Sequence, residues 1–503
     1  MAGDSVKTII FDIGDVLCSW VPPKTLGISP KLFKEFRDSH TWYDYDCGKI
    51  SEDECFARLA AQGGVSTTDV AAAFELARNS LVQNDGVVTA IRGLRAAHPH
   101  LRVYAMSNIS RPDWEMLRRK PFGWDIFDCI FTSCETGMRK PELRFYRHVL
   151  SETGTSPAES VFVDDKPDNI VAAHSLGFRE AILFDDAANV RRQLLNLLED
   201  PAQRGRAWIS GHAKEQCSET DRGDCIDDNF AQLLAYEAMG DGSLLNHRPF
   251  DRTWNYFAAP LGMPQKICDD VDTTSYAFKV LQLDNKMAHS IMDEMMSAEQ
   301  RTADGIVKVY FDKTNSRTDA AVCINVVRLH YKFGRGNEPG LQATKAWIQD
   351  VLFFRGYMNG TRYYPQPEVY LYFFARLLVE NRNSDLFRST AALLRERLME
   401  RINSPADSLG LAMRVLACHY MGIRDEMDLK RLLTRQQEDG SFGLGWLCSY
   451  GKTQVKVGSR VLTTALAVAA VEALTGSGVK AAQQGGTRAP MQYGHGVAVP
   501  ASA

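Results

Sequence analysis

Short apolar runs rich in β-branched residues alternate with amphipathic stretches through roughly the first 200 residues of the chain. The apolar runs predict strands, and the stretches between them, such as 31–39 and 70–83, predict helices. This alternation favours a parallel sheet with crossover helices. The predicted strands are 8–11, 102–106, 129–132, 161–163 and 181–184.

The segment from residue 20 to about residue 87 shows helical periodicity and no strand run. It follows the first predicted strand, which is a suitable place for a helical cap over an active site. We therefore expect an α/β domain over residues 1–198 with a helical cap at about 20–87.

The pattern changes in the second part of the chain. A polar stretch containing Gly and Asp predicts a linker at 199–227, and residues 228–476 have almost entirely helical spacing, which predicts an all-α domain. Residues 477–503 are rich in Gly, Ala and Gln and predict a disordered tail. The predicted helices are 229–239, 274–283, 287–296, 320–333, 344–353, 367–380, 407–420 and 463–474.

Composition agrees with a multidomain globular protein, because 503 residues exceed one ordinary core and 45% of them are hydrophobic. The net charge of -4 gives no electrostatic reason to expect nucleic acid or an anionic membrane as partner. No signal peptide and no window long enough to be an integral membrane segment are found, so we expect a cytoplasmic protein. The 11 cysteines form no CxxC pair, so neither a zinc site nor a disulfide framework is predicted. No pattern specifies an oligomeric state.

Polar residues follow the predicted strands in the order that a phosphoryl-transfer site would need. Asp12 comes directly after the first strand, and Ser107, which can hydrogen-bond a phosphate oxygen, ends the second. Lys140 can neutralise phosphate charge, and Asp164 and Asp165 can hold Mg²⁺ with their oxygens. Open α/β sheets bind ligands at the carboxyl ends of their strands, so we expect these side chains to form one site.

Through these motifs the first 200 residues resemble the haloacid-dehalogenase superfamily, which has a Rossmann-like α/β fold. The resemblance implies that Asp12 is a nucleophile that forms an aspartyl-phosphate. It also implies that Asp12, Asp164, Asp165 and the backbone carbonyl of Gly14 bind Mg²⁺. Phosphatases of this superfamily usually carry a general acid/base Asp two residues after the nucleophile, where this chain has Gly14, with Asp15 one residue later. An active phosphatase and an inactive scaffold therefore both stay open.

A dense polar run at 269–274, Asp-Asp-Val-Asp-Thr-Thr, opens a predicted helix ahead of an apolar face. One interpretation is an N-cap, because Asp and Thr side chains satisfy the free backbone N–H groups of a helix start. The other is a carboxylic acid that burial and a neighbouring carboxylate keep protonated. Such an acid could protonate an alkene held in a dry, aromatic-lined pocket.

Aromatic residues surround this run in the sequence. Aromatic faces stabilise carbocations by about 0.5–2 kcal/mol each, although most of these residues are expected to be ordinary helix-packing residues. The candidates are Trp254, Tyr256, Phe257, Tyr310, Phe311, Phe353, Phe354, Tyr363, Tyr364, Tyr370, Tyr372, Phe373 and Phe374.

The polar run resembles the motif of class II terpene cyclases, with DxDTT in place of DxDD. A second segment, QQEDGSFG at 436–443, is similar to the QxxDGSW repeat of squalene-hopene-type α/α barrels, with Phe442 in place of Trp. The resemblance covers about residues 228–476 and implies an all-α class II terpene cyclase barrel. No DDxxD motif accompanied by an NSE-type motif is found, so class I ionisation of a diphosphate is not expected.

The same resemblance implies roles for the residues of the motif. Asp272 would be the general acid and Asp270 its partner. Thr273 and Thr274 would bind the substrate. They occupy the positions at which other members of the family have an Asp and a supporting polar residue. Binding a diphosphate requires cations, and the last step of the reaction requires a proton acceptor. Each candidate for these roles could equally be an ordinary basic or polar residue. The cation candidates are Lys452, Lys456, Arg460, Lys313 and Arg317, and the acceptor candidates are His330 and Asn325.

The two domains together resemble the drimane-type sesquiterpene synthases, which act on farnesyl diphosphate. The resemblance implies that Asp272 protonates the terminal alkene and that two rings close to give a bicyclic drimenyl or albicanyl diphosphate. Asp12 would then release the alcohol. Two alternatives remain: a cyclase with an inactive dehalogenase-like scaffold, and a phosphatase whose helical domain only binds a partner or lipid.

Overall fold

The computed structural model describes residues 6–20, 27–212, 217–246, 252–257, 268–312, 314–450 and 454–476. The tail predicted at 477–503 and the cation candidates Lys313 and Lys452 lie outside these residues. The chain divides into two compact units, Met1–Glu199 and Asp200–Ala503. Within the described ranges, no helix combines the length and the apolar character that crossing a bilayer requires.

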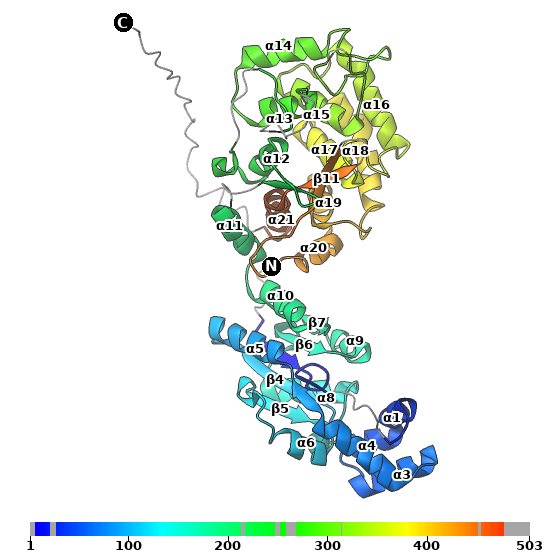
Figure 1. Ribbon diagram of the computed structural model, residues 1–503. Helices are drawn as coiled ribbons and strands as arrows, with labels where there is room; N and C mark the ends of the chain where they lie inside the picture. The colour runs from blue at the N-terminus through cyan, green and yellow to red at the C-terminus, as the bar shows by residue number, and fades with distance from the viewer. Residues whose placement is uncertain are drawn as a thin grey trace. The chain divides into compact units, whose positions relative to one another are not determined.

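A parallel sheet of five strands forms the centre of the first unit, in the order β5-β4-β1-β6-β7 (Figure 1). In β1 all four residues are buried, because a central parallel strand is covered on both faces. Ile9 lies opposite Val103 and Val161 on the two neighbouring strands. The five predicted strands are confirmed as β1 Thr8–Phe11, β4 Arg102–Ser107, β5 Cys129–Thr132, β6 Ser160–Asp164 and β7 Glu180–Leu183.

Helices pack on this sheet and form two separate apolar cores. Ile9 and Phe11 belong to one core and Ile10 to the other, because successive strand residues point to opposite faces. The helices are α5 Asp85–Ala97, α6 Arg111–Leu117, α7 Ser133–Thr136, α8 Leu143–Thr153, α9 Pro167–Ser175 and α10 Ala187–Leu198, with 3₁₀ turns η1 Trp124–Ile126 and η2 Pro157–Glu159.

The predicted helical cap is present as α1 Pro30–Arg37, α2 His40–Asp46, α3 Glu52–Gly63 and α4 Thr67–Asn79, with a core of its own. Each of these helices begins after a serine whose hydroxyl accepts a hydrogen bond from a backbone N–H of the first turn. The expectation of no strand in this segment is wrong. The antiparallel strands β2 Cys18–Trp20 and β3 Leu81–Gln83 frame the cap, and at three residues each they are too short to show a period.

Six helices form a closed ring in the second unit, in which each helix packs against the next and the last packs against the first. Ring helices are buried on nearly all sides; in α19 every residue from Ser408 to Cys418 is buried. The predicted α/α barrel is thereby confirmed. The ring consists of α12 Phe230–Met239, α13 Val271–Val280, α15 Ala320–Lys332, α17 Pro367–Glu380, α19 Ser408–Tyr420 and α21 Arg460–Thr475.

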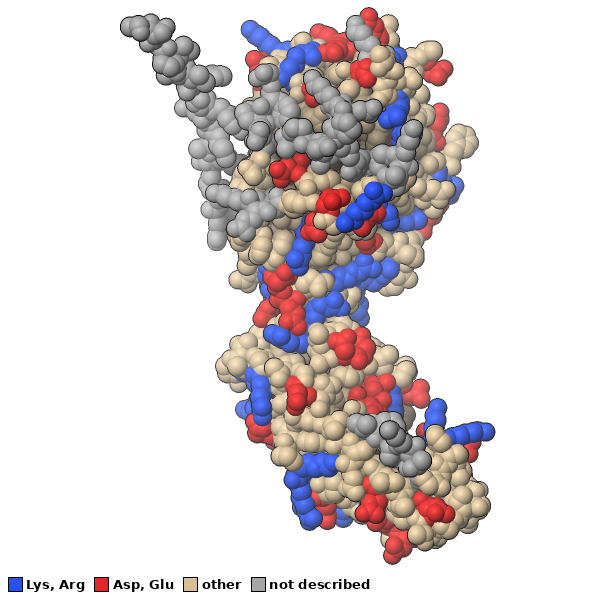
Figure 2. All heavy atoms as spheres, in the orientation of Figure 1, with Lys and Arg blue, Asp and Glu red and all other residues tan. Residues whose placement is uncertain are grey.

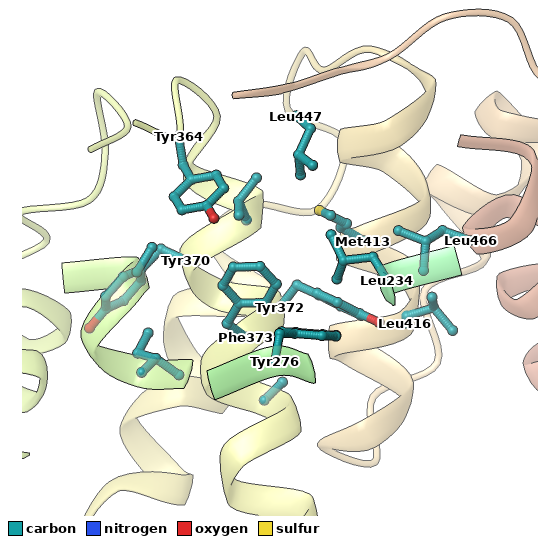
Figure 3. Packing of buried hydrophobic residues seen from close by; sticks show 14 of the residues in the cluster. Leu234, Tyr276, Tyr364, Tyr370, Tyr372, Phe373, Met413, Leu416, Leu447 and Leu466 are labelled. Carbon is teal, nitrogen blue, oxygen red and sulfur yellow. The ribbon is translucent and has the colours of Figure 1, made fainter. Parts of the chain in front are cut away.

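Large apolar and aromatic side chains fill the space inside the ring. Figure 3 shows Tyr276, Tyr372 and Phe373 packed with Leu234, Met413, Leu416 and Leu466, which come from five of the ring helices. Further helices lie outside the ring, and α16, α18 and α20 pack on α15, α17 and α19. The outer elements are α11 Pro201–His212, α14 Asn285–Met295, α16 Gln342–Phe353, α18 Asp385–Met399, α20 Glu426–Leu433 and the 3₁₀ turns η3 Gly242–Leu244 and η4 Pro339–Leu341.

Residues 199–227 differ from the predicted linker. This segment carries α11, which buries Trp208 and Ile209 against the barrel, and strands β8 Ser218–Thr220 and β9 Cys225–Ile226. Both strands belong to an antiparallel sheet in the order β10-β11-β8-β9, with β10 Trp446–Tyr450 and β11 Val455–Gly458. The sequence suggested a linker because most of the exposed residues of α11 are polar and its buried residues are few.

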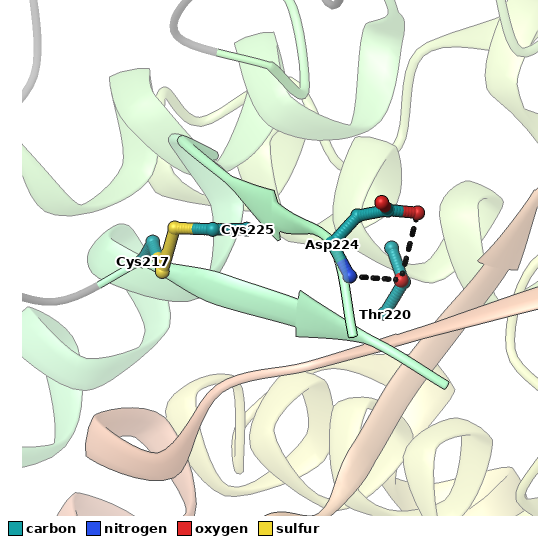
Figure 4. Close-up of a disulfide and its surroundings, with 4 residues drawn as sticks. All are labelled: Cys217, Thr220, Asp224 and Cys225. Carbon is teal, nitrogen blue, oxygen red and sulfur yellow. Dashed lines mark hydrogen bonds between the residues drawn. A yellow bond between two sulfur atoms is a disulfide. The ribbon is translucent and has the colours of Figure 1, made fainter. Parts of the chain in front are cut away.

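A disulfide joins Cys217 to Cys225 across the turn between β8 and β9 (Figure 4). The hydroxyl of Thr220 lies in the same turn, accepting from the backbone N–H of Asp224 at 3.0 Å and donating to its carboxylate at 3.3 Å. The scattered cysteines predicted no disulfide framework, and this single bridge was not foreseen, because two cysteines eight residues apart become partners only once the hairpin is known.

Positive and negative side chains are interspersed over each unit on the face shown in Figure 2. This distribution matches the small net charge of -4.

Candidate active sites

The first site lies where β1 and β6 end next to each other. Asp12 follows β1 directly, its backbone N–H donates to the carbonyl of Val163 at 2.8 Å, and its Oδ1 accepts from the N–H of Ile13 at 2.7 Å. Asp164 is the last residue of β6, and Asp165 follows it. Because parallel strands end at the same edge, the three carboxylates meet, as the sequence predicts.

Lys140 connects two of these carboxylates. Its Nζ lies 2.7 Å from Asp12 Oδ1 and 2.7 Å from Asp164 Oδ2, and the residue is 1% exposed. Two backbone hydrogen bonds to the Asn108 amide, at 2.8 and 2.9 Å, hold its main chain in place. The other oxygen of Asp164 accepts from Asn169 Nδ2 at 2.8 Å. Each partner of the lysine is therefore positioned independently.

Burial and charge act in opposite directions on this cluster. Burial raises the pKa of Asp12 to about 7, while the Lys140 ammonium opposes the shift and the Asp164 carboxylate adds to it. Burial tends to lower the pKa of Lys140, but Asp12 and Asp164 outweigh it and the pKa is raised. The lysine between two carboxylates therefore keeps its proton.

The oxygens of Asp12, Asp164 and Asp165 lie within 4.8 Å of one another, close enough for one cation. Asp165 Oδ1 is buried and has no hydrogen-bond partner among the described residues. An oxygen in this state is costly unless a ligand satisfies it, and hard oxygen donors are what Mg²⁺ prefers. The residues present therefore fit a magnesium ion.

A cavity of about 170 Å³ lies beside this cluster and is lined by Gly14, Asp15, Ser107 and Asn108 from the sheet edge. Ser107 is buried, and a Cβ added to Gly14 would meet no atom within 4 Å. Asp15 adopts a positive φ of 56°, which non-glycine residues seldom do. The structure thus brings together Asp12, Ser107, Lys140, Asp164 and Asp165 as the sequence predicts.

The second site lies at the start of α13. Asp270 is the N-cap, and its carboxylate accepts from the backbone N–H of Thr273 at 2.6 Å and from the Thr273 hydroxyl at 3.1 Å. The Thr274 hydroxyl donates to the Asp270 carbonyl at 2.7 Å and accepts from the N–H of Trp254 at 2.8 Å. The capping interpretation is thus correct for Asp270, and the two threonines stiffen the start of the helix.

Asp272 is buried and contacts neutral hydrogen-bond donors. Asn325 Nδ2 of α15 donates to its Oδ1 at 2.8 Å, and the Tyr364 hydroxyl donates to its Oδ2. The sequence marked Asn325 only as a proton acceptor and Tyr364 only as one aromatic residue among many. Their contact with Asp272 was missed, because they are distant in the sequence.

The pKa values of both aspartates in the motif are raised. Burial raises the pKa of Asp272 to about 7, against the hydrogen bonds from Tyr364 and Asn325. Burial and then the charge of Asp272 raise the pKa of Asp270 to about 8. Both oxygens of each aspartate accept hydrogen bonds, those of Asp270 from Thr273 and those of Asp272 from Asn325 and Tyr364, so the raised pKa values fit either carboxyl as a neutral acid in this site.

A cavity of about 70 Å³ contains both carboxylates. Among its described lining residues there is no Lys or Arg, and Cys448 and Ser449 of β10 contribute one side. Five of the thirteen aromatic candidates line it: Tyr256, Phe257, Tyr310, Tyr363 and Tyr364. Of the others, Phe353 and Phe354 are exposed and most are buried in the barrel core, as ordinary packing predicts.

The predicted cations are not gathered in this cavity. Arg460 donates to Asp439 Oδ2 at 2.9 Å and to the Ser441 hydroxyl at 2.8 Å, so it binds the QQEDGSFG segment. Arg317 is exposed and does not line the cavity. His330 is fully buried against the carbonyl of Val326 and does not line the cavity.

Comparisons with known proteins match each unit separately. The model of haloacid dehalogenase-like hydrolases matches residues 6–177, and the model of the sesquiterpene cyclase astC-like C-terminal domain matches residues 202–333. Sesquiterpene phosphatase astK of Aspergillus oryzae is 39% identical over 182 residues, which are 36% of this chain and 92% of that protein.

One relative matches both units together. Drimenol cyclase drtB of Aspergillus calidoustus is 42% identical over 477 residues, which are 94% of this chain and 89% of that protein. Among solved structures, a variant of the type II terpene cyclase MstE from Scytonema aligns over 57% of this chain and 99% of its own, with 11% identity and a TM-score of 0.39.

Proposed function

The chain belongs to the family of drimenol cyclase drtB, in which a haloacid-dehalogenase-like domain is joined to a class II terpene cyclase domain, and on this basis we propose that it converts farnesyl diphosphate into a drimane-type alcohol. The observation that carries the proposal is Asp272, a buried carboxyl with a raised pKa in an aromatic-lined cavity without cations among its described residues.

Cyclisation begins at Asp272. Its proton is transferred to the terminal alkene, two rings close, and loss of a proton ends the cascade with the C–O bond of the diphosphate intact. The hydrogen bonds from Tyr364 and Asn325 stabilise the carboxylate that remains. Tyr256, Tyr310 and the other aromatic rings of the cavity wall stabilise the positive charge by cation–π attraction.

The product diphosphate is then hydrolysed in the first unit. Asp12 attacks the terminal phosphorus, the P–O bond to the inner phosphate breaks, and water hydrolyses the aspartyl-phosphate to orthophosphate. A second cycle on the remaining monophosphate breaks the bond from phosphorus to the alcohol oxygen, which takes up a proton, and the alcohol is released. Lys140 holds Asp12 in position and opposes the negative charge of the phosphoryl group. Asp12, Asp164 and Asp165 would hold Mg²⁺, which when bound neutralises phosphate charge.

The experiment that tests the proposal is incubation of the full-length protein with farnesyl diphosphate and Mg²⁺, followed by product analysis with and without added alkaline phosphatase. The wild-type protein should give a bicyclic alcohol in both samples. Asp12→Asn should give that alcohol only after added phosphatase. Farnesol alone in every sample would refute cyclisation of this substrate.

The same experiment separates the cyclase-only alternative. If the wild-type protein gives the bicyclic alcohol only after added phosphatase, Gly14 has left the first unit without hydrolytic activity. Identical products from Asp12→Asn and the wild-type protein would also refute the role of Asp12.

A further inference from the structure

The cavity beside Asp12 has walls of two different kinds. One side is the polar sheet edge with Ser107 and Asn108, next to the carboxylate cluster. The other side is formed by the cap helices α1, α2 and α4 and by the residue that ends β2. The apolar residues Ile13, Leu81, Ile109 and Leu117 complete the lining.

Four aromatic rings of the cap side form a continuous series. Trp20 stacks on Phe33 with ring centroids 5.2 Å apart, Phe33 contacts Phe74 at 4.6 Å, and Phe74 stacks on Trp42 at 4.3 Å. All four line the cavity. A phosphatase needs no aromatic wall for the phosphate itself, which requires cations and hydrogen-bond donors. The series therefore points to the part of the substrate that leaves.

Two arginines of the lining differ in their ion pairs. Arg78 is ion-paired with Asp113 and Glu52, so its charge is already neutralised. Arg37 also lines the cavity and has no ion pair within 4.0 Å among the described residues, which leaves a cation for phosphate oxygens. A sugar would leave its hydroxyl groups unpaired against the aromatic rings.

We propose that this cavity is the binding site for the hydrocarbon of an isoprenoid phosphate ester, and that Trp42, Phe33 and Phe74 determine this specificity. The inference rests on the proposed hydrolysis at Asp12 and adds where the hydrocarbon lies and which residues recognise it. The apolar chain lies against the rings while its phosphate reaches Asp12 and Lys140 at the polar edge. The removal of apolar surface from water drives this binding, because the rings and the chain are both apolar.

The test is steady-state hydrolysis by the full-length protein of three phosphate compounds. Farnesyl monophosphate carries the hydrocarbon, acetyl phosphate is too small to reach the rings, and flavin mononucleotide has a large polar leaving group. We expect kcat/KM for farnesyl monophosphate to exceed that for flavin mononucleotide by about 100-fold, while acetyl phosphate, whose leaving group is intrinsically reactive, serves as the reference for an intact phosphate site. Equal values for farnesyl monophosphate and flavin mononucleotide would overturn the proposal.

Two variants alter the cavity in opposite ways. Trp42→Ala removes part of the aromatic wall, and Ala77→Phe fills the space from α4, where Ala77 lines the cavity. Each should lower kcat/KM for farnesyl monophosphate by about tenfold or more, mainly through KM, and change acetyl phosphate hydrolysis less than about twofold. Acetyl phosphate hydrolysis shows whether the phosphate site is intact in each variant, so a loss caused by misfolding can be recognised.

The matched control is Phe56→Leu. Phe56 stacks on Phe74 in the cap core at 5.7 Å but does not line the cavity. It should leave the ratio between farnesyl monophosphate and acetyl phosphate unchanged. If Phe56→Leu changes this ratio as much as Trp42→Ala, the effect comes from cap stability and the proposal fails.

Asp12→Asn shows which of two proposals fails, hydrolysis at Asp12 or hydrocarbon binding in the cavity. If it abolishes hydrolysis of both compounds while Trp42→Ala and Ala77→Phe affect them equally, the phosphatase site stands and the hydrocarbon site is wrong. If Asp12→Asn leaves hydrolysis intact, the proposed function of the first unit is itself wrong.

Discussion

The two sites use the same side chain in opposite surroundings. Asp12 and Asp272 are both buried, and burial raises the pKa of each to about 7. Asp12 contacts the Lys140 ammonium and lies among further carboxylates, whereas Asp272 contacts two neutral donors, Tyr364 and Asn325. A neighbouring cation favours the charged carboxylate, and a cavity without one favours the neutral acid.

The difference teaches how an aspartate acquires its role. Burial alone does not decide between nucleophile and acid, because both residues are about equally buried. The charge of the contacting groups decides it, together with what the adjoining cavity can hold. The polar edge beside Asp12 fits phosphate, and the aromatic wall beside Asp272 fits a hydrocarbon cation.

The largest effect is expected from Asp272→Asn, which removes the acid and keeps the shape. Formation of the bicyclic product should fall by about 10³-fold, since an amide has no proton acidic enough for an alkene. Hydrolysis of farnesyl monophosphate should remain unchanged, which released orthophosphate without added phosphatase measures, while the bicyclic alcohol found after added phosphatase measures cyclisation. Asp269→Asn, one position before the motif, is the control and should keep full cyclisation. Loss of cyclisation in both variants would refute the special role of Asp272.

Lys140→Met removes the cation that distinguishes the surroundings of Asp12 from those of Asp272. It leaves two buried carboxylates without their counter-charge, so the first unit should lose about 3–5 kcal/mol of stability and all hydrolysis, while cyclisation continues. Hydrogen exchange of the β1 and β6 amides in Mg²⁺-free buffer measures the stability. Lys166→Met, which replaces an exposed lysine two residues beyond Asp164, should change it little. Equal protection in the two variants would contradict a stabilising role for Lys140.

Features that depend on local periodicity could be predicted from the sequence. Helix α17 was placed at its observed bounds, because Pro367 marks its start and an apolar run follows. The amphipathic outer helices α18 and α20 and the short strand β10 were missed, because few of their residues are buried or they are short. Side chains at the ends of predicted strands could be joined into one site, because parallel topology brings strand ends together.

Contacts between distant segments could not be predicted. Tyr364 and Asp272 are 92 residues apart, and Ser449 of β10 reaches the cavity because its N–H donates to the Tyr363 carbonyl at 2.7 Å. Such contacts follow from the closure of the helical ring, which no local pattern encodes.

Gly14→Asp would give the first site a carboxylic acid that can donate a proton to the leaving group, as Asp272 donates one in the second site. A Cβ at Gly14 meets no atom within 4 Å, so the side chain can be accommodated. An alkoxide leaving group needs a proton, whereas acetate does not, so hydrolysis of farnesyl monophosphate should rise about tenfold and that of acetyl phosphate should not. Gly14→Asn is the isosteric control without an acid. A gain with Asn, or none with Asp, would show that protonation of the leaving group does not limit the reaction.

The smallest effect is expected from Tyr364→Phe, which removes one donor from Asp272. Cyclisation requires the protonated acid, so the wild-type rate should fall as pH rises through about 7. The Tyr364 hydrogen bond lowers the pKa of Asp272, and its loss should raise that pKa and move the alkaline limb to higher pH. The rate below pH 7 should fall by about two- to fivefold, since a weaker acid protonates an alkene more slowly.

The measurement is kcat for cyclisation against pH in an Asp12→Asn background, where the bicyclic diphosphate accumulates and is quantified after added phosphatase. Tyr370→Phe is the matched control, because that hydroxyl donates to the Ile348 carbonyl and does not line the cavity. An alkaline limb that stays in place or moves to lower pH in Tyr364→Phe would mean that the group titrating in the cyclisation step is not Asp272. In that event Asp270, whose pKa burial raises to about 8 and whose oxygens Thr273 engages, becomes the residue to replace next.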